Sequence, residues 1–512
     1  MRAFLSVYDK AGVADFAAGL VELGWDLVSS GGTAAALRDA GLAVTDVADL
    51  TGVPPILGHR VVTLHPKVHG GILADRSNPE HRRDAEEYGI EPIDLVVSNL
   101  YPFGSDPALF QHGSSATDID LIDIGGPALV RAAAKNHAHV GVVVDPADYD
   151  PVLDELRTGG ALGPDTRRRL ARTAFAHTAA YDASVVTWFD ATDADAAPLP
   201  PTLHLALEQA QVTRYGENPH QRGARYRRIG ERSWWDDVEQ HSGLDLSYLN
   251  LYDADAAWRC VHDLGPEPAV VIVKHANPCG VAIASTLHEA YQRAYDCDSR
   301  SAFGGIVALN RVVDDDTVAR IVAAAQADLI IAPGYEDGVI DLLIGRRKNT
   351  RILTAPTPTS DPLELRQIGG GFLVQDAHRF VATRADWSVV TARQPTESQW
   401  ADAELAWRLV GWVKSNAIVL VKDRTAWGIG AGQQNRVESG QLAATKAAGR
   451  AAGGASASDA FYPFPDGIEA AAAAGVAVVV QPGGAMRDDE NIAKADDLGI
   501  AMVFTGERHF FH

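Results

Sequence analysis

Short apolar runs alternate with amphipathic helical patterns along the first 190 residues of the chain. This alternation predicts an α/β fold in which helices cover both faces of a parallel sheet. Ligands of such sheets bind beyond the carboxyl ends of the strands, where Ser6, Ser30 and Asn99 stand. The predicted strands are AFLSVY (3–8), WDLVSS (25–30), DLVVSNLY (94–101) and HVGVVV (139–144).

An acidic, Ala/Pro-rich and aperiodic stretch at 190–202 is typical of a linker. We therefore predict one domain over residues 1–195 and a second over residues 203–512. In the second part, a strand that enters a Gly/Asn-rich loop occurs around 270–310 and again around 415–485, which suggests two similar subdomains. The buried strands predicted here are AVVIVKH (269–275), GGIVALN (304–310), DLIIAP (328–333), NAIVLV (416–421) and VAVVVQPGG (476–484).

Composition narrows the class of protein. A chain of 512 residues is too long for one core, and 46% hydrophobic with 22% charged residues is typical of globular proteins. A net charge of -22 argues against nucleic acid or a membrane surface as a partner. There is no signal-peptide pattern and no apolar run of membrane-spanning length, and the three cysteines form no CxxC. We expect a cytoplasmic protein.

The segment VVIVKHANPCG (270–280) places a cation, a base, an amide and a thiol at the exit of a buried strand. Cys279 could act as a nucleophile beside His275, but a buried cysteine is usually a small apolar filler. Zinc deaminases share its Pro-Cys pair, yet position 282 is alanine and not their second cysteine ligand. Lys274 and His275 are the more economical pair, because the imidazole can take a proton from an attacking amine while the cation stabilises an oxyanion.

The stretch SSGGTAAALRDAG (29–41) runs from a strand end into a helix. Free backbone N–H groups and the helix dipole at such a point would suit a phosphate. The alternative is a tight turn in which Thr33 is only the N-cap. No Walker lysine follows, so nucleoside triphosphate binding is not indicated.

The stretch HRVVTLHPKVHGG (59–71) is basic and carries three histidines. His65 and His69 have the spacing of metal ligands on a helix. Pro66 and the glycines at 70–71 argue against a helix there, so we predict an anion-binding loop rather than a zinc site.

Two further motifs allow two interpretations each. IDIGGPALVRAAAKNH (122–137) predicts a helix with Pro127 at its first position. Its cations could be solvated, or Asp123 and Lys135 could serve acid–base chemistry. GIGAGQQNR (428–436) fails the dinucleotide fingerprint, and its glycines permit either close approach of the backbone to a ligand or a flexible hairpin.

Taken in order, these motifs make the chain resemble, over essentially its whole length, the bifunctional purine biosynthesis family that fuses AICAR (aminoimidazole carboxamide ribonucleotide) transformylase to IMP cyclohydrolase. So many long motifs in the right order make a chance resemblance negligible. The motifs are SVYDK (6–10), SSGGTA (29–34), TLHPKVHGGIL (63–73), NLYPF (99–103), IDIGGPALVRAAAKNH (122–137), RYGENPHQ (214–221), VKHANPCG (273–280), SAFGG (301–305), VKSNAI (413–418), GIGAGQQNR (428–436) and SDAFYPFPD (458–466).

The resemblance implies a methylglyoxal-synthase-like parallel-sheet domain followed by two cytidine-deaminase-like α/β subdomains without zinc. It implies formyl transfer from 10-formyltetrahydrofolate to AICAR, then dehydrative ring closure of formyl-AICAR to IMP. It also implies a homodimer with shared transformylase sites, and no catalytic metal, nucleic acid or membrane. A structural monovalent cation stays open.

By the same resemblance, His275 is the base of formyl transfer, Lys274 lies by the formyl group, and Asn416 orients the folate or His275. The nucleotide and folate contacts that it implies are Arg214, Tyr215, His220, Phe303, Gly304, Asp328, Gln433, Arg436, Phe461, Asp466, Arg508 and Phe510.

For ring closure, the resemblance implies Tyr101, Asp123 and Lys135 as the proton-transfer set. The phosphate, ribose and base contacts that it implies are Ser6, Lys10, Ser30, Gly32, Thr33, Arg60, Thr63, Lys67, Asn99, Gly125 and Gly126.

One position departs from the family pattern, because RVVTLHP stands where the family usually reads RVKTLHP. Val62 thus replaces a lysine, and only Lys67 or His59 offers a nearby replacement charge. We expect ring closure to survive at a reduced rate. One alternative is a transformylase with a weakened cyclohydrolase. The other is a non-catalytic binding protein, and the intact set of Lys274, His275 and Asn416 counts against this second alternative. Methylglyoxal synthase activity fits the motifs poorly.

Overall fold

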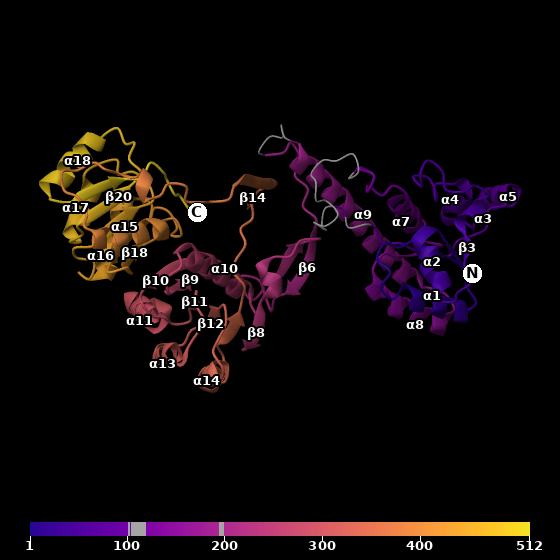
Figure 1. The fold of residues 1–512 in the computed structure, drawn as a ribbon, viewed down its shortest axis with the longest axis horizontal. Coiled ribbons are helices and arrows are strands. Elements are labelled where there is room, and N and C mark those ends of the chain that lie inside the picture. The colour runs from indigo at the N-terminus through magenta and orange to yellow at the C-terminus, as the bar shows by residue number, and fades with distance from the viewer. Residues whose placement is uncertain (101–102, 104–118, 194–198) are drawn as a thin grey trace. The chain divides into compact units, whose positions relative to one another are not determined.

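The computed structural model describes residues 1–100, 103, 119–193 and 199–512. These form two compact units (Figure 1). Unit 1 comprises Met1–Glu208 with Arg228–Glu231, and unit 2 comprises Gln209–Arg227 with Arg232–His512. Within the described ranges, no helix has the length and apolar character needed to cross a bilayer.

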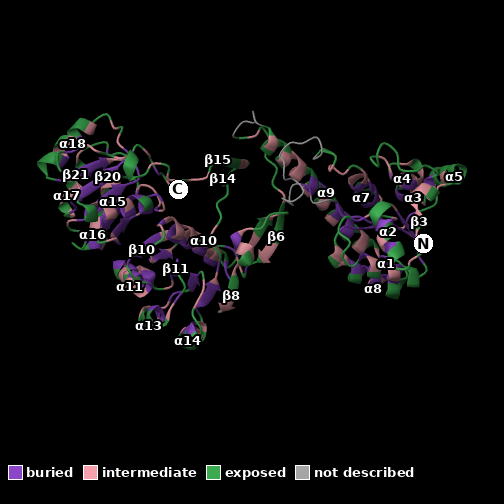
Figure 2. Cartoon of the chain, in the orientation of Figure 1, coloured by how far each residue is buried: buried purple, intermediate pink, exposed green. Residues whose placement is uncertain are grey.

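Unit 1 is built on a five-stranded parallel sheet in the order β3-β2-β1-β4-β5. The central strands β1 and β4 are buried along most of their length (Figure 2), which explains their continuous apolar runs. All four strands predicted for this part are present. The strands are β1 (Arg2–Leu5), β2 (Asp26–Ser29), β3 (Thr45–Asp46), β4 (Leu95–Val97) and β5 (Gly141–Val143), and the helices are α1 (Val13–Glu22), α2 (Gly31–Asp39), α3 (Val47–Thr51), α4 (Pro66–Leu73), α5 (Pro79–Tyr88), α7 (Gly125–Lys135), α8 (Tyr149–Gly159) and α9 (Pro164–Thr192).

The prediction that residues 59–71 contain no helix is wrong, because α4 begins at Pro66. Proline is tolerated at the first helical position, where its missing N–H needs no partner. The His65 ring caps the helix by accepting a hydrogen bond from the Lys67 N–H at 3.1 Å. The glycine at position 71 serves close packing, because a Cβ there would lie 2.5 Å from the Glu91 carbonyl oxygen.

Two predicted helix starts are also corrected. The N-cap of α2 is Ser30, not Thr33. The Thr33 hydroxyl instead bonds the Val7 main chain, accepting from its N–H at 3.1 Å and donating to its carbonyl at 3.0 Å. In α7, Pro127 is the third residue and not the first, still within the turn whose N–H groups need no helical partner.

Unit 2 contains one continuous sheet of twelve strands, in the order β16-β21-β20-β19-β17-β18-β10-β9-β11-β12-β13-β8. The strands are β8 (Glu239–Ser242), β9 (Ala269–Lys274), β10 (Asn277–Ile283), β11 (Ile306–Leu309), β12 (Leu329–Ala332), β13 (Arg351–Thr354), β16 (Ser388–Val389), β17 (Ile418–Lys422), β18 (Thr425–Gly430), β19 (Ala455–Ser458), β20 (Val478–Gln481) and β21 (Ala501–Phe504). The helices are α10 (Tyr248–Asp263), α11 (Leu287–Cys297), α12 (Ser299–Ala302), α13 (Asp315–Ala323), α14 (Val339–Arg346), α15 (Glu397–Val410), α16 (Arg436–Ala447), α17 (Asp466–Ala473) and α18 (Asp488–Asp497).

The sheet consists of two halves with the same element order, joined where β10 lies antiparallel to β18. Each half has an edge strand, a long helix, a hairpin, and then helices alternating with three parallel strands. The similarity extends to single residues: α10 and α15 both begin with a capping box, at Ser247 and Thr396, and both bury a tryptophan, Trp258 or Trp407. These halves contain the two regions, around 270–310 and 415–485, that share a plan in the sequence.

Glycines in the hairpins permit the helices to lie directly on the strands. A Cβ on Gly280 of β10 would overlap the Ala294 carbonyl oxygen of α11, and one on Gly428 of β18 would overlap that of Ala443 in α16. The interpretation of residues 428–436 as a flexible hairpin or a ligand-approach loop is therefore wrong for the first glycines, which are strand residues needed for packing.

Two ribbons lie outside these sheets: β6 (Leu207–Val212) with β7 (Ala224–Arg228), and β14 (Leu363–Ile368) with β15 (Gly371–Asp376). No residue of β14 or β15 is buried. Phe372 and Leu373 are 56% and 59% exposed.

Candidate active sites

One edge of the twelve-stranded sheet gathers the predicted transformylase residues from both halves. Because β9 is antiparallel to β11, the carboxyl end of β9 meets the amino ends of β11 and β12. Because β10 is antiparallel to β18, the same edge continues to the amino end of β17 and the carboxyl ends of β18 and β19. Lys274 and Asn416, far apart in sequence, therefore lie along one edge.

The Lys274 ammonium is held at this edge by the loop before β11. Its Nζ donates to the Phe303 carbonyl oxygen at 2.7 Å. A Cβ on Gly304 would lie 3.1 Å from this Nζ and 3.7 Å from Asp328 Oδ1, and the positive φ of Gly304 also favours glycine. The loop thus lets the cation stand close to Asp328 without a side chain in between.

His275 is exposed at the tip of the β9–β10 turn and has a positive φ of 54°. The Asn277 amide ties this turn to the segment before Asn416, because its Oδ1 accepts from the Lys414 N–H at 3.1 Å. Its Nδ2 donates back to the His275 carbonyl oxygen at 3.2 Å. The turn with the candidate base and the segment with the candidate amide are therefore linked directly.

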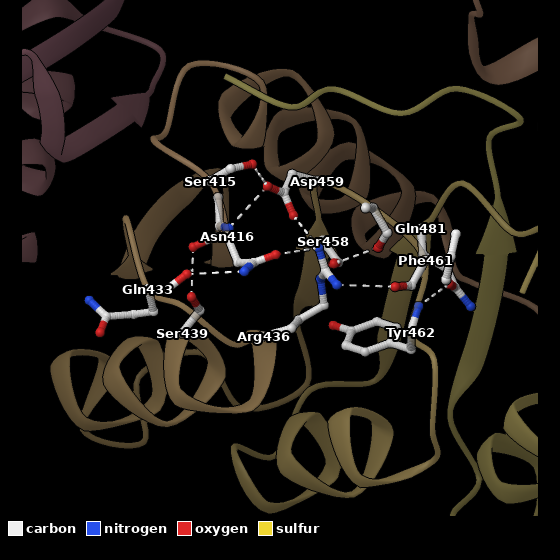
Figure 3. A network of polar contacts seen from close by, with 12 residues as sticks. Ser415, Asn416, Gln433, Arg436, Ser439, Ser458, Asp459, Phe461, Tyr462 and Gln481 are labelled. Carbon is white, nitrogen blue, oxygen red and sulfur yellow. Dashed lines mark hydrogen bonds and ion pairs between the residues drawn. The ribbon is translucent and has the colours of Figure 1, made fainter. Parts of the chain in front are cut away.

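Asn416 lies in a polar network whose centre is the buried Asp459 (Figure 3). Arg436 Nη2 donates to both Asn416 Oδ1 and Asp459 Oδ1 at 2.9 Å. Asn416 Nδ2 donates to the Gln433 carbonyl oxygen at 3.0 Å, and Asp459 also accepts from the Ser415 hydroxyl. Both ends of the Asn416 amide are thus paired, so its side chain organises the loop around Arg436.

The chain's last residues lie against the same network. His509 N–H donates to the Asp459 carbonyl oxygen at 2.9 Å, and Ser415 N–H donates to that of Phe511 at 2.9 Å. The Arg508 guanidinium stacks over the Phe510 ring, 4.5 Å from its centroid. The cation and ring predicted near the nucleotide are therefore one stacked pair.

Two further cations, Arg214 and Arg351, belong to unit 2. The Arg214 guanidinium lies over the Tyr215 ring at 5.4 Å. Burial lowers the pKa of the Arg351 guanidinium, the charge of Arg214 lowers it further, and Asp328 opposes the shift. Arg351 was missed from the sequence; it is the first residue of β13, it is buried, and its Nε donates to the Leu244 carbonyl oxygen at 3.0 Å.

Of the remaining predicted transformylase residues, Gln433 and Phe461 belong to the Asn416 network (Figure 3). His220 is exposed in the loop between β6 and β7. Asp466 begins α17 and accepts from the Gly467 N–H at 2.8 Å. Gln433 Nε2 donates to the Ala431 carbonyl, and the Phe461 carbonyl accepts from Arg436 at 3.2 Å.

Cys279 belongs to the apolar core beneath α11. Its thiol donates to the Ile272 carbonyl oxygen at 3.4 Å, and burial raises its pKa to about 12. A thiol of this kind is not a nucleophile at neutral pH, which supports its interpretation as packing. No group of three or more His, Cys, Asp or Glu side chains in the described ranges could hold a metal ion.

In unit 1, the predicted residues cluster at the carboxyl edge of the parallel sheet. Lys10 Nζ donates to the Tyr8 carbonyl at 3.3 Å and would lie 3.9 Å from a Cβ on Gly32, at the amino end of α2. The Asn99 amide holds this loop, because its Oδ1 accepts from the N–H groups of Tyr8 and Asp9 at 2.7 and 2.9 Å. A lysine beside free N–H groups of a helix forms an anion site.

Asp123 lies at the amino end of α7, against the two glycines. Its Oδ1 accepts from the Gly126 N–H at 2.9 Å. Burial raises the pKa of its carboxyl group, although the hydrogen bonds from Gly126 and Gly125 oppose the shift. A Cβ on Gly125 would lie 2.9 Å from Thr63 Oγ1, so the structure brings Thr63 to the same place.

Helix α9 supplies two polar residues that the sequence reasoning missed. Tyr181 accepts at its hydroxyl oxygen from the Asp123 N–H at 2.6 Å. His177 Nε2 accepts from the Leu100 N–H at 3.1 Å, and burial lowers its pKa, which favours the neutral acceptor form. Their spacing of four residues on one helix face is the only sequence signal for the pair.

Of the two residues predicted to offer a replacement charge near Val62, His59 is exposed and Lys67 is half-buried in α4. Val62 packs against the core of unit 1. Arg60 is exposed and ion-paired with Asp120, and Lys135 is exposed at the end of α7. Tyr101 lies outside the described residues.

Comparisons with known proteins cover the whole chain. A family model described as AICARFT/IMPCHase bienzyme matches residues 133–446, and one described as MGS-like domain matches residues 12–128. The bifunctional purine biosynthesis protein PurH of Cereibacter sphaeroides is 50% identical over 100% of this chain and 98% of its own length. The proteins of the same name from Cyanothece sp. and Halalkalibacterium halodurans are 49% and 47% identical, each over 100% of this chain and 99% of their own length.

A solved structure, that of ForH, is 45% identical and covers 37% of this chain and 98% of its own, with a TM-score of 0.34. The family matches and the parallel sheet of unit 1 confirm the predicted α/β fold class, with a methylglyoxal-synthase-like domain first. The chain therefore belongs to the AICARFT/IMPCHase bienzyme family, a family of bifunctional formyltransferases and cyclohydrolases.

Proposed function

We propose that this chain transfers the formyl group of 10-formyltetrahydrofolate to AICAR and then closes the product to IMP. We assign formyl transfer to residues 203–512 and ring closure to residues 1–195. The observation that carries the proposal is the alignment of Lys274, His275 and the Asn416 network along one sheet edge, in a chain half identical to full-length bifunctional relatives.

Formyl transfer needs help at two atoms. The 5-amino group of AICAR is a poor nucleophile because its lone pair is drawn into the imidazole carboxamide. His275 takes the amine proton as the nitrogen attacks the formyl carbon. Lys274, held by the Phe303 carbonyl, stabilises the oxyanion of the tetrahedral intermediate.

The nucleotide and folate contacts follow from the cations and rings of the same edge. The exposed guanidinium of Arg214, which lies over the Tyr215 ring, binds the AICAR phosphate. The exposed rings of Phe303, Phe461 and Phe510 offer apolar surface for the flat pterin and purine precursors.

Ring closure uses an acid near the new formyl group. Asp123 fills this role, because its carboxyl group lies at the amino end of α7 beside the two glycines and burial raises its pKa. The amino end of α2 with Lys10 holds the phosphate, and Lys135 and Tyr101 complete the proton-transfer set.

His275→Ala tests the formyl-transfer assignment in the purified full-length enzyme. Loss of a positioned general base lowers the rate on the order of 10²- to 10⁴-fold. AICAR consumption with 10-formyltetrahydrofolate is measured by the appearance of tetrahydrofolate. A variant that keeps the full rate contradicts the role of His275.

Val62 affects only the second step. The comparisons support both activities and give no support to a transformylase-only protein. We propose that ring closure proceeds at a reduced rate, because the other residues of its site are present. Purified protein supplied with formyl-AICAR should form IMP above the uncatalysed rate, and Val62→Lys should accelerate it. IMP formation no faster than in buffer would remove the proposal.

We also propose a cytoplasmic homodimer. An isolated two-stranded ribbon is marginally stable in water, and β14–β15 exposes Phe372 and Leu373. A second copy of the chain covers this ribbon. Sedimentation of the intact protein should give a dimer, and Phe372→Ser with Leu373→Ser should shift it toward monomer. An unchanged dimer in that variant would exclude the ribbon as the interface.

A further inference from the structure

The turn that carries His275 has a counterpart in the second half of the sheet. Lys274 leads into His275 and Ala276, and Lys422 leads into Asp423 and Arg424, at the same point of the β9–β10 and β17–β18 hairpins. In both turns, two successive residues other than glycine adopt positive φ, 54° and 54° in the first and 49° and 57° in the second. This conformation is unfavourable for residues with a Cβ, so surrounding contacts must hold it.

The same contact holds both turns. Asp253 is the sixth residue of α10, and its Oδ1 accepts from the Ala276 N–H at 2.8 Å. Asp402 is the sixth residue of α15, and its Oδ1 accepts from the Arg424 N–H at 2.7 Å. Each carboxyl also receives the backbone N–H of the preceding residue in its turn.

The two turns differ in what they present. The first carries the Lys274–His275 pair at the candidate active site. The second carries Asp423 and Arg424, whose guanidinium pairs with Glu267 at the opposite edge of the sheet. Asp402 therefore has a purely structural task, and it provides an internal reference for Asp253.

We propose that Asp253 is a positioning residue for formyl transfer, which fixes the left-handed turn so that the His275 imidazole points at the AICAR amine. This inference rests on the proposed role of His275 as the base. The carboxyl group also lies close to the reacting pair: burial raises the pKa of Asp253, and the charges of His275 and Lys274 oppose that rise. A displacement of His275 by about 1 Å is enough to lower the rate on the order of 10²-fold.

The test compares Asp253→Ala and Asp253→Asn with Asp402→Ala in the full-length enzyme. Asp253→Ala should lower kcat for formyl transfer on the order of 10²-fold while KM for AICAR stays within about threefold, because the nucleotide is held elsewhere. Asp253→Asn should recover about tenfold of this loss, because the amide oxygen can accept the same hydrogen bond. Asp402→Ala removes a more buried carboxyl and should lower the melting temperature at least as much, yet leave kcat within about twofold.

A double-mutant cycle with His275→Ala separates positioning from general destabilisation. Because Asp253 acts through His275, adding Asp253→Ala to His275→Ala should change the residual rate by less than about twofold. An equal loss in both backgrounds, or an equal loss of kcat in Asp402→Ala, would overturn the proposal. If His275→Ala keeps the full rate of formyl transfer, the assignment of His275 as the base fails. If His275→Ala loses rate but Asp253→Ala keeps the full rate, only the positioning role of Asp253 is refuted. Should Asp253→Ala fail to fold, Asp253→Ser decides, because its side chain is one atom shorter and loses the bond to the Ala276 N–H: a kcat equal to wild type with the His275→Ala defect intact overturns the inference.

Discussion

Replacing the buried Asp459 should destabilise unit 2 strongly, and a second substitution at its partner Arg436 should restore part of the loss. Asp459 is 0% exposed and the Arg436 side chain 12% exposed. The carboxylate accepts from Arg436, from the Ser415 hydroxyl and, at 3.1 Å, from the Ala417 N–H. In Asp459→Asn, either orientation of the amide turns its NH2 group toward at least one donor and leaves the guanidinium without its counter-charge. Breaking a buried pair in this way costs about 3–5 kcal/mol.

In the first half of the sheet, an uncharged side chain, Asn310, stands at the position that corresponds to Asp459, directly after the strand. There, Asn310 Oδ1 accepts from the Ala269 N–H at 2.8 Å and its Nδ2 donates to the Glu267 carbonyl at 2.8 Å. Leu287 stands first in α11, where Arg436 stands first in α16. The double variant Arg436→Leu/Asp459→Asn copies this arrangement and should regain at least about 2 kcal/mol over Asp459→Asn alone.

Urea unfolding of the full chain, followed by tryptophan fluorescence, measures these differences. Of the ten tryptophans only Trp25 and Trp188 belong to unit 1, so the signal reports mainly on unit 2. Formyl transfer should stay impaired in the stable double variant, because its Asn416 loop has lost Arg436. A single variant within about 1 kcal/mol of wild type, or a double variant no more stable than the single, would refute the reasoning.

Three further predictions test packing, ionisation and the cyclohydrolase site. Gly280→Ala should destabilise unit 2 by about 3 kcal/mol, because a Cβ there overlaps a helix carbonyl. The control Gly345→Ala, at an open helix position, should stabilise it by about 1 kcal/mol. The midpoints of urea unfolding distinguish the two variants. Burial alone would raise the pKa of Asp236, but hydrogen bonds from a nearby serine and Arg225 lower it to about 2. Its contribution of about 2 kcal/mol is therefore present above about pH 4 and lost as the pH falls toward 2, and Asp236→Asn should remove this part of the acid-unfolding slope. Tyr181→Phe should slow ring closure about tenfold and leave formyl transfer unchanged, since it removes the hydrogen-bond acceptor of the candidate acid's N–H; loss of both activities would indicate misfolding instead.

Four strands of unit 1 and five of unit 2 were predictable because their apolar runs report burial on both faces, as at residues 95–97 and 269–274. Helix α4 was not predictable. Pro66 stands at the start of the helix, where proline is tolerated, and the glycine at position 71 is needed for a close contact with Glu91. Only the folded chain reveals these two roles. Strand β10 was hidden for a similar reason, because its first residues, Asn277, Pro278 and Cys279, lie in a stretch that the sequence predicts to be a loop.

The candidate sites divide in the same way. Lys274 and His275 could be singled out from the sequence because their chemistry stands next to a buried strand. Asp253, Arg351 and Tyr181 could not, since each acts on a residue more than twenty positions away and has an ordinary local pattern. Partners brought together by topology leave no periodic signal along the chain.

Substrates that bind where the two halves of unit 2 meet should stabilise the protein. In the described part of the sheet, the pairing of β10 with β18 is registered at a single pair, Ala282 with Thr425. The candidate transformylase site takes Lys274 from one side of this joint and Asn416 from the other. A folate or nucleotide that contacts both halves therefore links them, and its binding free energy adds to the free energy of unfolding. The occupied enzyme is therefore expected to unfold at a higher temperature than the empty protein.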